Sequence, residues 1–288
     1  MKNASLSYEQ NFFVNGTGLS GVQAINGSYG INEQPINVIG HGYVNNIINQ
    51  PLEGEFTIQR TLINEDALLN MTGDNIAFSG VVTYKHGAVS TGSFGFHSGY
   101  LTSYSISCEV GNLPSVSTNI SVYGDLGPGI LSASETAGVG SASANDKTIE
   151  PPNMGSMTIT CDELKTATNR IVSFSHEVNC PRQAVYALPV SASDTTAKFP
   201  VQVDSIYPIE QTTNLTLEID DYQTKNLYDY LTGVYTGKVN IDINGDNGTS
   251  LASFHLDDAR LVNESFSSEI DGVALVNLTF TKYINRTR

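Results

Sequence analysis

Two stretches of the chain share one arrangement of apolar and polar positions. The first, residues 51–73, reads PLEGEFTIQRTLINEDALLNMTG, and the second, residues 208–233, reads PIEQTTNLTLEIDDYQTKNLYDYLTG. Each begins with apolar residues alternating with polar ones, which predicts a strand with one buried and one solvated face. Acidic residues, an apolar stripe and a Thr-Gly pair follow, and these predict a short helix with a carboxylate-rich start and a glycine end. The pattern therefore predicts one strand-helix unit that occurs twice.

Flanking stretches match in the same order. The aligned pairs are 34–40 with 183–189, 80–84 with 237–241, 100–106 with 260–266, and 119–122 with 277–280. The spacing is nearly constant and far longer than a solenoid repeat, so it indicates a duplicated domain. We predict a first β domain over residues 1–124, a linker rich in Gly, Ser, Ala and Pro over 125–155, and a second β domain over 156–288.

Short alternating stretches, broken by Gly, Asn and Pro, fill most of both halves and are typical of β-sandwiches and barrels. The predicted fold is mainly β, with two tandem sandwich or barrel domains and one short α-helix in each. Residues 36–50 and 185–207, which precede the repeated units, are predicted to be long hairpins with apolar side chains. Such a hairpin either pairs with another molecule or folds back on its own sheet, and the sequence leaves both open.

Charge and composition narrow the possible functions. The 288 residues carry a net charge of -15, and acidic residues exceed basic ones in both halves. Tight nucleic-acid binding needs Lys and Arg against phosphates, so this class is disfavoured. No apolar run approaches the ~18 residues of a membrane-spanning helix, and we expect no membrane partner. The first residues lack a secretory apolar block, and the three cysteines are expected to be reduced thiols of a cytoplasmic product.

Motifs that suggest binding sites are weak. Residues 16–21 form a G-x-G-x-x-G, but a strand-like stretch follows it where a dinucleotide site needs a helix. Residues 242–248 resemble the start of a calcium loop. Its Gly is misplaced, however, and Ser253 stands where a bidentate Glu is required, so a hairpin turn is predicted.

No combination of residues predicts catalysis. The five histidines share no metal-ligand spacing, and no Ser, Cys or Lys lies in a recognisable nucleophile motif. Asp220 and Asp221 are better explained as helix caps than as an acid-base pair. We therefore expect no catalytic residues, no cofactor and no metal, and we do not expect an enzyme.

Taken together, the chain resembles the tail tube (major tail) proteins of long-tailed bacteriophages, in their two-domain, duplicated form. The resemblance lies in the units 51–73 and 208–233, in the hairpins before them, and in the stretch PPNMGSM at 151–157. It covers nearly the whole chain, although the linker is longer than is typical of this family.

The resemblance implies an assembly. Sheets of neighbouring domains would join in a closed ring, and a homotrimer would supply six quasi-equivalent positions, which hides every sheet edge. Rings would stack into a tube that serves as the conduit for DNA ejection. The hairpin residues expected to contact the next ring are Tyr43, Val44, Ile47, Ile48, Val190, Phe199 and Val201.

The same resemblance implies the partners. These are sister copies, the tail terminator, and tail tip or baseplate proteins, while the tape measure protein and double-stranded DNA pass through the lumen without tight binding. The protein would be made in the host cytoplasm and reside in the virion tail. An alternative class is a carbohydrate- or receptor-binding β-sandwich module of a virion or adhesin, which aromatic side chains over a groove would favour. A β-rich hydrolase is a further alternative and would need a buried acid pair.

Overall fold

The computed structural model describes residues 10–30, 33–36, 42, 44, 46–49, 53–69, 72, 77–86, 89–129, 152, 157–161, 171–187, 199–218, 237–270 and 272–286. These residues form antiparallel β-sheet with almost no helix, which confirms the mainly β prediction. The strands of the first half are β1 (Gln10–Val14), β2 (Thr17–Leu19), β3 (Val22–Gly30), β4 (Glu33–Ile36), β5 (Asn46–Asn49), β6 (Glu53–Thr61), β7 (Phe78–His86), β8 (Val89–Glu109), β9 (Ser115–Val122) and β10 (Leu126–Pro128). Those of the second half are β11 (Met157–Cys161), β12 (Ile171–Asn179), β13 (Arg182–Val185), β14 (Gln202–Ser205), β15 (Ile209–Glu218), β16 (Gly237–Asn244), β17 (Ser250–Ser267) and β18 (Leu275–Ile284).

Strand pairing follows the same order in the two halves. The first half pairs in the order β1-β7-β8-β9-β6-β3. The second pairs as β11-β16-β17-β18-β15-β12. The register irregularities coincide as well: one lies between Val22 and Ala24 of β3, and another lies between Ile171 and Ser173 of β12. Bulges are specific features of a strand, so their shared placement supports an equivalence of the two halves strand by strand.

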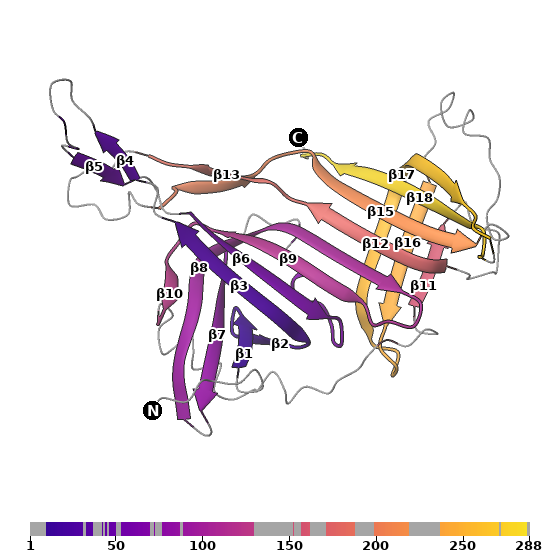
Figure 1. Cartoon of the computed structure of the whole chain (residues 1–288), viewed down its shortest axis with the longest axis horizontal. Helices are drawn as coiled ribbons and strands as arrows, with labels where there is room; N and C mark the ends of the chain where they lie inside the picture. The colour runs from indigo at the N-terminus through magenta and orange to yellow at the C-terminus, as the bar shows by residue number, and fades with distance from the viewer. Residues whose placement is uncertain are drawn as a thin grey trace.

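Each half has two layers because one long strand serves both (Figure 1). The beginning of β8 pairs with β7 and its end with β9, and β17 likewise passes from β16 to β18. Near the change of partner, Ser98 and Asp258 have φ angles of 53° and 61°, a left-handed conformation that is uncommon outside glycine. In the first half, the Phe56 ring on β6 packs between the layers, with its centroid 5.8 Å from Phe12 and 4.9 Å from Phe96.

The two halves share one sheet and one core. The end of β8, residues 103–109, pairs antiparallel with residues 173–179 of β12. Most of the buried apolar residues of both halves form one continuous cluster across this junction. Of the predicted linker, β10 pairs with β8, and most of the remainder lies outside the described residues. The domain boundaries remain a prediction.

The short helix predicted after the first repeated strand is not confirmed. Its described residues are irregular or form a turn, except Leu69, which has 3-10 conformation. Asp66, rather than Asn64, accepts the backbone N–H groups of Leu68 and Leu69, at 2.8 and 3.3 Å. The backbone N–H of Asp66 donates to the carbonyl of Leu251 on β17, 2.9 Å away. Contacts to distant strands thus fix Asp66 in this segment. The second predicted helix falls on residues outside the described part.

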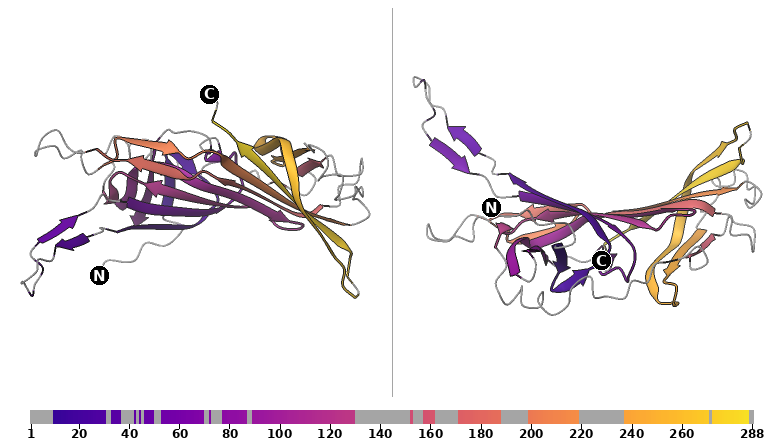
Figure 2. Two further views of the ribbon diagram at one scale, coloured as in Figure 1. Left: turned by 90° about the horizontal axis from the view of Figure 1, so that it is seen from above. Right: turned by 60° about the horizontal axis from the view of Figure 1, so that its bottom comes forward.

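Short paired strands stand where the two hairpins were predicted. β4 pairs with β5, and β13 with β14, each as a separate two-stranded sheet. Figure 2 shows the β4–β5 pair projecting away from the body of the molecule in both views. The turn between β16 and β17 is also a hairpin, as predicted, with Gly248 at φ 84°. A strand, β3, follows the glycine motif at residues 16–21.

Candidate assembly surfaces

Two strand edges of the joined sheet lack a partner among the described residues. From one border to the other, the sheet runs β3-β6-β9-β8-β12-β15-β18-β17. β3 pairs only with β6, and residues 260–267 of β17 pair only with β18. An edge with free N–H and C=O groups is a template for pairing with another chain. Native proteins blunt such edges with charged side chains, Pro or bulges. β3 has a bulge but no charged residue and no Pro, whereas residues 260–267 have a bulge and contain Arg260 and Glu264.

The edges also expose large apolar side chains. Tyr29 on β3 is 51% exposed, and Phe266 on β17 is 60% exposed. At the junction inside the chain, by contrast, Tyr104 and Ile106 on β8 are buried, as is Val178 on β12. Each border strand therefore exposes a large aromatic side chain, whereas the apolar side chains at the internal junction are buried.

One face of the joined sheet is polar and acidic. On this face, which is opposite the core, small Ser, Thr and Asn side chains alternate with glutamates. The glutamates are Glu53, Glu55, Glu109, Glu177, Glu210 and Glu218. No Lys or Arg takes a position on this face in the described stretches 24–30 and 103–109 or in β6, β9, β12 and β15. Arg260 and Lys282 lie toward the far border, in a hollow that they share with Asp257 and Asp258.

Cross-strand hydrogen bonds tie the small polar side chains of this face together. Thr57 donates to Asn119 Oδ1 at 3.0 Å, and the Asn119 amide donates to Ser103 at 2.9 Å. In the second half, Thr216 donates to Asn277 Oδ1 at 2.8 Å, on the strands that correspond to those of Thr57 and Asn119. Such ladders fix short side chains in place, so the face is hydrophilic without long mobile groups.

The predicted hairpin contacts are apolar and exposed where the structure describes them. Val44 is 49% exposed, Ile47 50% and Val201 73%, while Phe199 is half-buried. Tyr43 and Val190 lie outside the described residues, and Ile48 lies in β5 with its side chain outside the description. Their docking on a neighbouring ring stays a prediction.

Sequence reasoning missed further apolar residues at the ends of the sheet. Ile36, Val185 and Ile206 are also exposed and lie on or next to the two paired hairpins. The turns β8–β9 and β17–β18 expose another set, Val110, Leu113, Ile270 and Val273. Because β9 runs from its turn at Ser115 toward the hairpin end, these turns and the hairpins lie at opposite ends of the strands. These residues could have been predicted from the sequence, because they are apolar residues next to turn-forming stretches.

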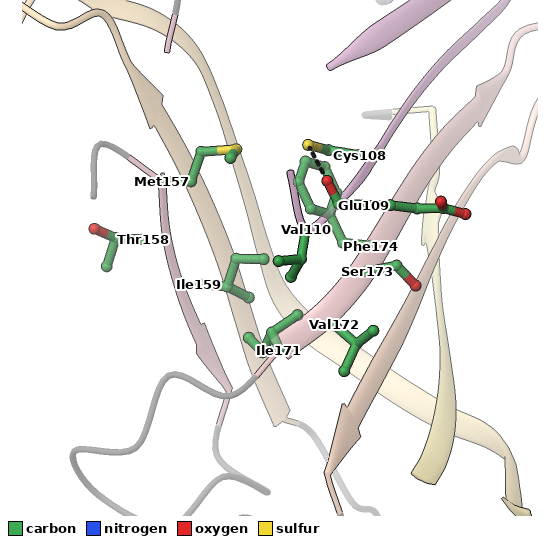
Figure 3. Close-up of a pocket in the computed structure, with 10 residues that line it drawn as sticks. All are labelled: Cys108, Glu109, Val110, Met157, Thr158, Ile159, Ile171, Val172, Ser173 and Phe174. Atoms are coloured by element: carbon green, nitrogen blue, oxygen red, sulfur yellow. Dashed lines mark hydrogen bonds between the residues drawn. The ribbon is translucent and has the colours of Figure 1, made fainter. Parts of the chain in front are cut away.

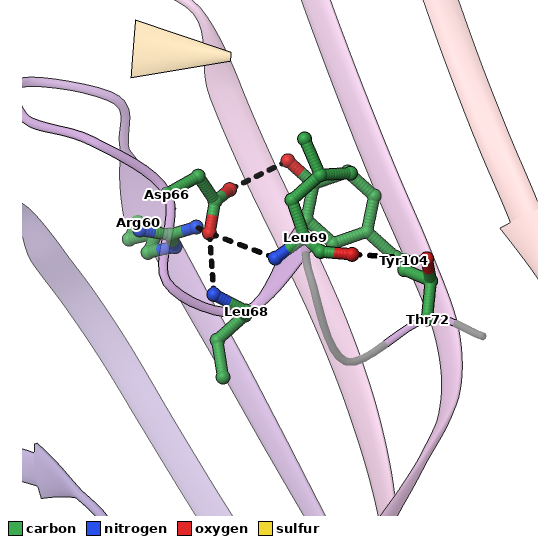
Figure 4. Close-up of polar contacts among 6 residues, drawn as sticks. All are labelled: Arg60, Asp66, Leu68, Leu69, Thr72 and Tyr104. Carbon is green, nitrogen blue, oxygen red and sulfur yellow. Dashed lines mark hydrogen bonds and ion pairs between the residues drawn. The ribbon is translucent and has the colours of Figure 1, made fainter. Parts of the chain in front are cut away.

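A buried polar cluster joins the first repeated unit to the core (Figure 4). Arg60 forms an ion pair with Asp66, and both side chains are nearly inaccessible to solvent. The Tyr104 hydroxyl donates to Asp66 Oδ2 at 2.6 Å. Burial first, and the Asp66 carboxylate second, raise the pKa of Tyr104 well above its usual value. The carboxylate thus accepts from three side-chain and backbone partners besides its ion pair, which fits a structural role.

His176 lies buried at the junction of the two halves. Its Nδ1 is 2.8 Å from the Thr213 hydroxyl, and its ring is 4.5 Å from that of Phe254 on the opposite layer. Burial lowers the pKa of His176 to about 4, so the folded protein keeps the ring neutral.

This depressed pKa predicts that acid weakens the fold. The stabilisation by neutral His176 is fully present above pH ~6.5 and is lost as pH falls toward 4, because the unfolded chain takes up a proton first. The expected loss is on the order of 3 kcal/mol, measured by urea unfolding at pH 7 and pH 4.5. His176→Asn retains a hydrogen-bonding group for Thr213 and is expected to show a smaller difference between the two pH values. An equal difference in variant and native protein contradicts this assignment.

A hollow of about 240 Å³ lies beside the junction, between β11 and the ends of β8 and β12 (Figure 3). Met157, Ile159, Ile171 and Phe174 line it together with Cys108. Burial, followed by the charge of Glu109, raises the pKa of the Cys108 thiol. A protonated thiol in such a hollow is a poor nucleophile, so Cys108 is not an activated cysteine.

A surface cluster on β16 and β17 has the residue types of a catalytic triad. Ser253 Oγ is 2.5 Å from Asp242 Oδ1 and 2.8 Å from His255 Nε2, and that same Nε2 is 3.1 Å from Asp242 Oδ1. A triad needs the carboxylate on the second ring nitrogen, so that the imidazole is oriented between Ser and Asp. Here both partners contact one nitrogen on an exposed surface, and the arrangement supports no proton relay.

Among the described residues, no group of three or more His, Cys, Asp or Glu side chains is placed to hold a metal ion. Nor does any helix among these residues have the length and apolar character to cross a membrane. Cys108, Cys161 and Cys180 form no disulfide in the described part of the chain, and Cys108 and Cys180 are buried.

Comparison with known protein families and with curated proteins finds no match to this chain. The sheet edges, the polar face and the hairpins therefore carry the functional argument.

Proposed function

We propose that this chain is the tube-forming subunit of a long-tailed bacteriophage tail, which assembles as stacked rings of three copies into a conduit for DNA ejection. The observation that carries the proposal is the repeated pairing order of the two halves, together with the sheet that runs through both and ends in two open edges. A duplicated tail tube domain of this kind accounts for both features.

The nature of the two edges favours a ring. The open edges belong to different strands, so copies that pair β3 with β17 associate head to tail. Head-to-tail association closes into a ring when the rotation permits and leaves no free edge. With two equivalent halves per chain, three copies provide six similar positions.

The acidic face suits the lumen of such a ring. In a closed sheet one face turns inward, and the core of each half occupies the other. Glutamates repel the phosphates of DNA, and short hydrogen-bonded Ser, Thr and Asn side chains offer it few groups to bind. The tape measure protein and DNA would pass through this lumen without tight binding.

The apolar ends suit stacking. Both hairpins lie at one end of the strands, and both apolar turns lie at the other, so a second ring placed on the first brings the two sets together. The terminal rings would then present one set each to the tail terminator and to the tail tip or baseplate.

The alternative, a carbohydrate- or receptor-binding module, is less well supported. It needs aromatic side chains gathered over one groove. Tyr29 and Tyr283 are exposed on strands near opposite borders of the sheet, and Phe266 lies on the border strand beyond Tyr283.

Negative-stain microscopy of the purified protein tests the proposal directly. Rings or tubes with a central channel are expected. A protein that remains monomeric by light scattering at high concentration, with no rings in the images, would overturn it.

The acidic lumen predicts weak binding to DNA. At ~50 mM salt, where phosphate contacts are strongest, we expect no salt-sensitive binding of assembled protein to duplex DNA. The reason is that the polar face has no Lys or Arg in the described stretches 24–30 and 103–109 or in β6, β9, β12 and β15 to replace counterions on the phosphates. Fluorescence anisotropy of a labelled duplex measures this. A steep loss of binding between ~50 and ~200 mM salt would contradict a repelling lumen.

A further inference from the structure

We infer that β3 of one copy pairs antiparallel with residues 263–269 of a second copy, in the register that β12 adopts on β8 within one chain. This inference rests on the proposed assembly and deepens it by naming the two edges and their alignment. Its experiment nevertheless has an outcome independent of tube formation.

β3 of the first half is equivalent to β12 of the second half. Ile25 pairs with Ile58 of β6, and Phe174 pairs with Leu215 of β15, where β6 and β15 are the two copies of the repeated strand. The bulge lies one step before this pair in both halves. Counting from these anchors, Ser28 corresponds to Glu177 and Tyr29 to Val178.

The end of β8 is likewise equivalent to the end of β17. Leu101 pairs with Ile120, and Leu261 pairs with Phe280, with a bulge directly after each pair. Ser105 then corresponds to Ser265. By the same count, Ile106 corresponds to Phe266.

The register of β12 on β8 can therefore be applied to β3 and the end of β17. Within the chain, Glu177 lies opposite Ser105, and Val178 opposite Tyr104. The transferred register places Ser28 opposite Ser265 and Asn26 opposite Ser267. It also brings Tyr29 next to the second copy's Glu264, to which a tyrosine hydroxyl can donate.

The chemistry of the two edges agrees with this register. Phe266 is 60% exposed, whereas Ile106, its counterpart in the internal junction, is 1% exposed. It would lie opposite Gly27, which has no side chain to obstruct it. Glu269 would lie opposite Ala24, so the alignment places no like charges across from each other, which would be unfavourable. Since β12 buries Ile106 in the internal junction, we expect β3 of the second copy to bury Phe266 in the same way.

A second copy is the fitting occupant because the two edges lie at opposite borders of the sheet and do not meet within the chain. β3 and β17 are the first and last of eight strands in the joined sheet. Neither pairs with the other in the described structure. β3 therefore requires a strand like β17 as its partner, and β17 requires a strand like β3. Another copy of this chain supplies both.

Disulfide formation between singly substituted chains tests the register. Chains with Ser28→Cys are mixed with chains carrying Ser265→Cys, in a Cys161→Ser background where Cys108 and Cys180 stay buried. The Cβ atoms of directly opposite residues on paired strands lie about 4.5–5.5 Å apart, within reach of a disulfide, whereas those of diagonal neighbours lie about 7–8 Å apart. We expect cross-linked dimers in this mixture and in Asn26→Cys with Ser267→Cys. The diagonal mixtures, Ser28→Cys with Ser267→Cys and Asn26→Cys with Ser265→Cys, are the matched controls.

The outcomes separate the register from the function. Cross-links no stronger than the diagonal controls, while microscopy shows rings, overturn the β3–β17 register and leave the tube proposal standing. In-register cross-links without rings or tubes support the pairing and count against the tube. A monomer without cross-links overturns both.

A surface substitution gives an independent measurement. Phe266→Lys places a charge at the proposed contact and, because the side chain is exposed, leaves the fold of the single chain intact. We expect at least a tenfold loss of assembled protein in sedimentation. His255→Lys, exposed on the other end of the same strand, is the control and should assemble normally. Normal assembly of Phe266→Lys contradicts the inferred contact.

Discussion

Replacement of Asp66 by alanine is expected to lower the free energy of unfolding by about 3–5 kcal/mol. The substitution leaves the buried Arg60 guanidinium without its counter-ion, and an uncompensated buried charge is among the costliest defects in a protein. It also removes the acceptor for the Tyr104 hydroxyl and for the N–H groups of Leu68 and Leu69. Guanidinium unfolding, followed by circular dichroism, measures the change.

The second half of the chain provides the design of the control. At the position equivalent to Arg60, the repeated strand carries the buried Leu217. In the double variant Arg60→Leu/Asp66→Asn, the charge pair is replaced by an apolar side chain and an amide that still accepts hydrogen bonds. It should recover most of the lost stability, because the desolvated charges disappear together. A loss below about 1 kcal/mol for Asp66→Ala would show that the pair contributes little.

Deletion of residues 43–48 is expected to leave folded subunits that form rings but do not elongate into tubes. The region includes Val44 and Ile47, which are about half exposed and lie at the end of the sheet opposite the apolar turns. Removal of these side chains removes the apolar area on which ring stacking depends in the proposed assembly. Electron microscopy gives the distribution of tube lengths, and circular dichroism reports whether the subunit is folded.

A length-matched variant distinguishes the effect of shortening the hairpin from the effect of losing its apolar contacts. Replacement of residues 43–48 by Gly and Ser keeps the length of the segment and removes its apolar side chains. The same failure to elongate is expected if contacts drive stacking. Tubes of normal length from the deletion variant contradict a stacking role for this hairpin.

The alternation of apolar and polar residues was sufficient to predict the mainly β fold and the strands of the repeated units. Phe56 and Ile58 are buried, as are Leu215 and Leu217 at the matching positions. This success has a local cause, since the two-residue period of a strand is visible in any short window of sequence.

The helix predicted after β6 is not confirmed, and contacts between distant residues act on its described part. The segment after β6 has helix-like composition, but Asp66 is held by Arg60, by Tyr104 and by the carbonyl of Leu251. None of these contacts is visible in the local pattern. One signal was available: Arg60 follows Phe56 and Ile58 at a two-residue spacing, so it stands where a buried residue is expected and requires a buried counter-ion.

The sequence also does not reveal which strand edges meet. Alternation identifies the buried face of β8 and β12 but not that their edges pair with each other, because edge contacts use backbone groups common to all residues. The exposed hairpin residues were predictable for a different reason: Ile47 and Val201 are apolar residues next to turn-forming stretches.

The pairing of β8 with β12 within one chain would affect how fast the proposed rings assemble. Units tethered in one polypeptide meet at millimolar effective concentration, so this contact forms as the chain folds, however dilute the protein is. In a three-copy ring, every second contact would thus be guaranteed in advance, and only the remaining three would depend on collisions. In the proposed assembly, two equivalent halves in one chain would halve the number of encounters that ring closure requires, and polymerisation would then begin at lower protein concentrations.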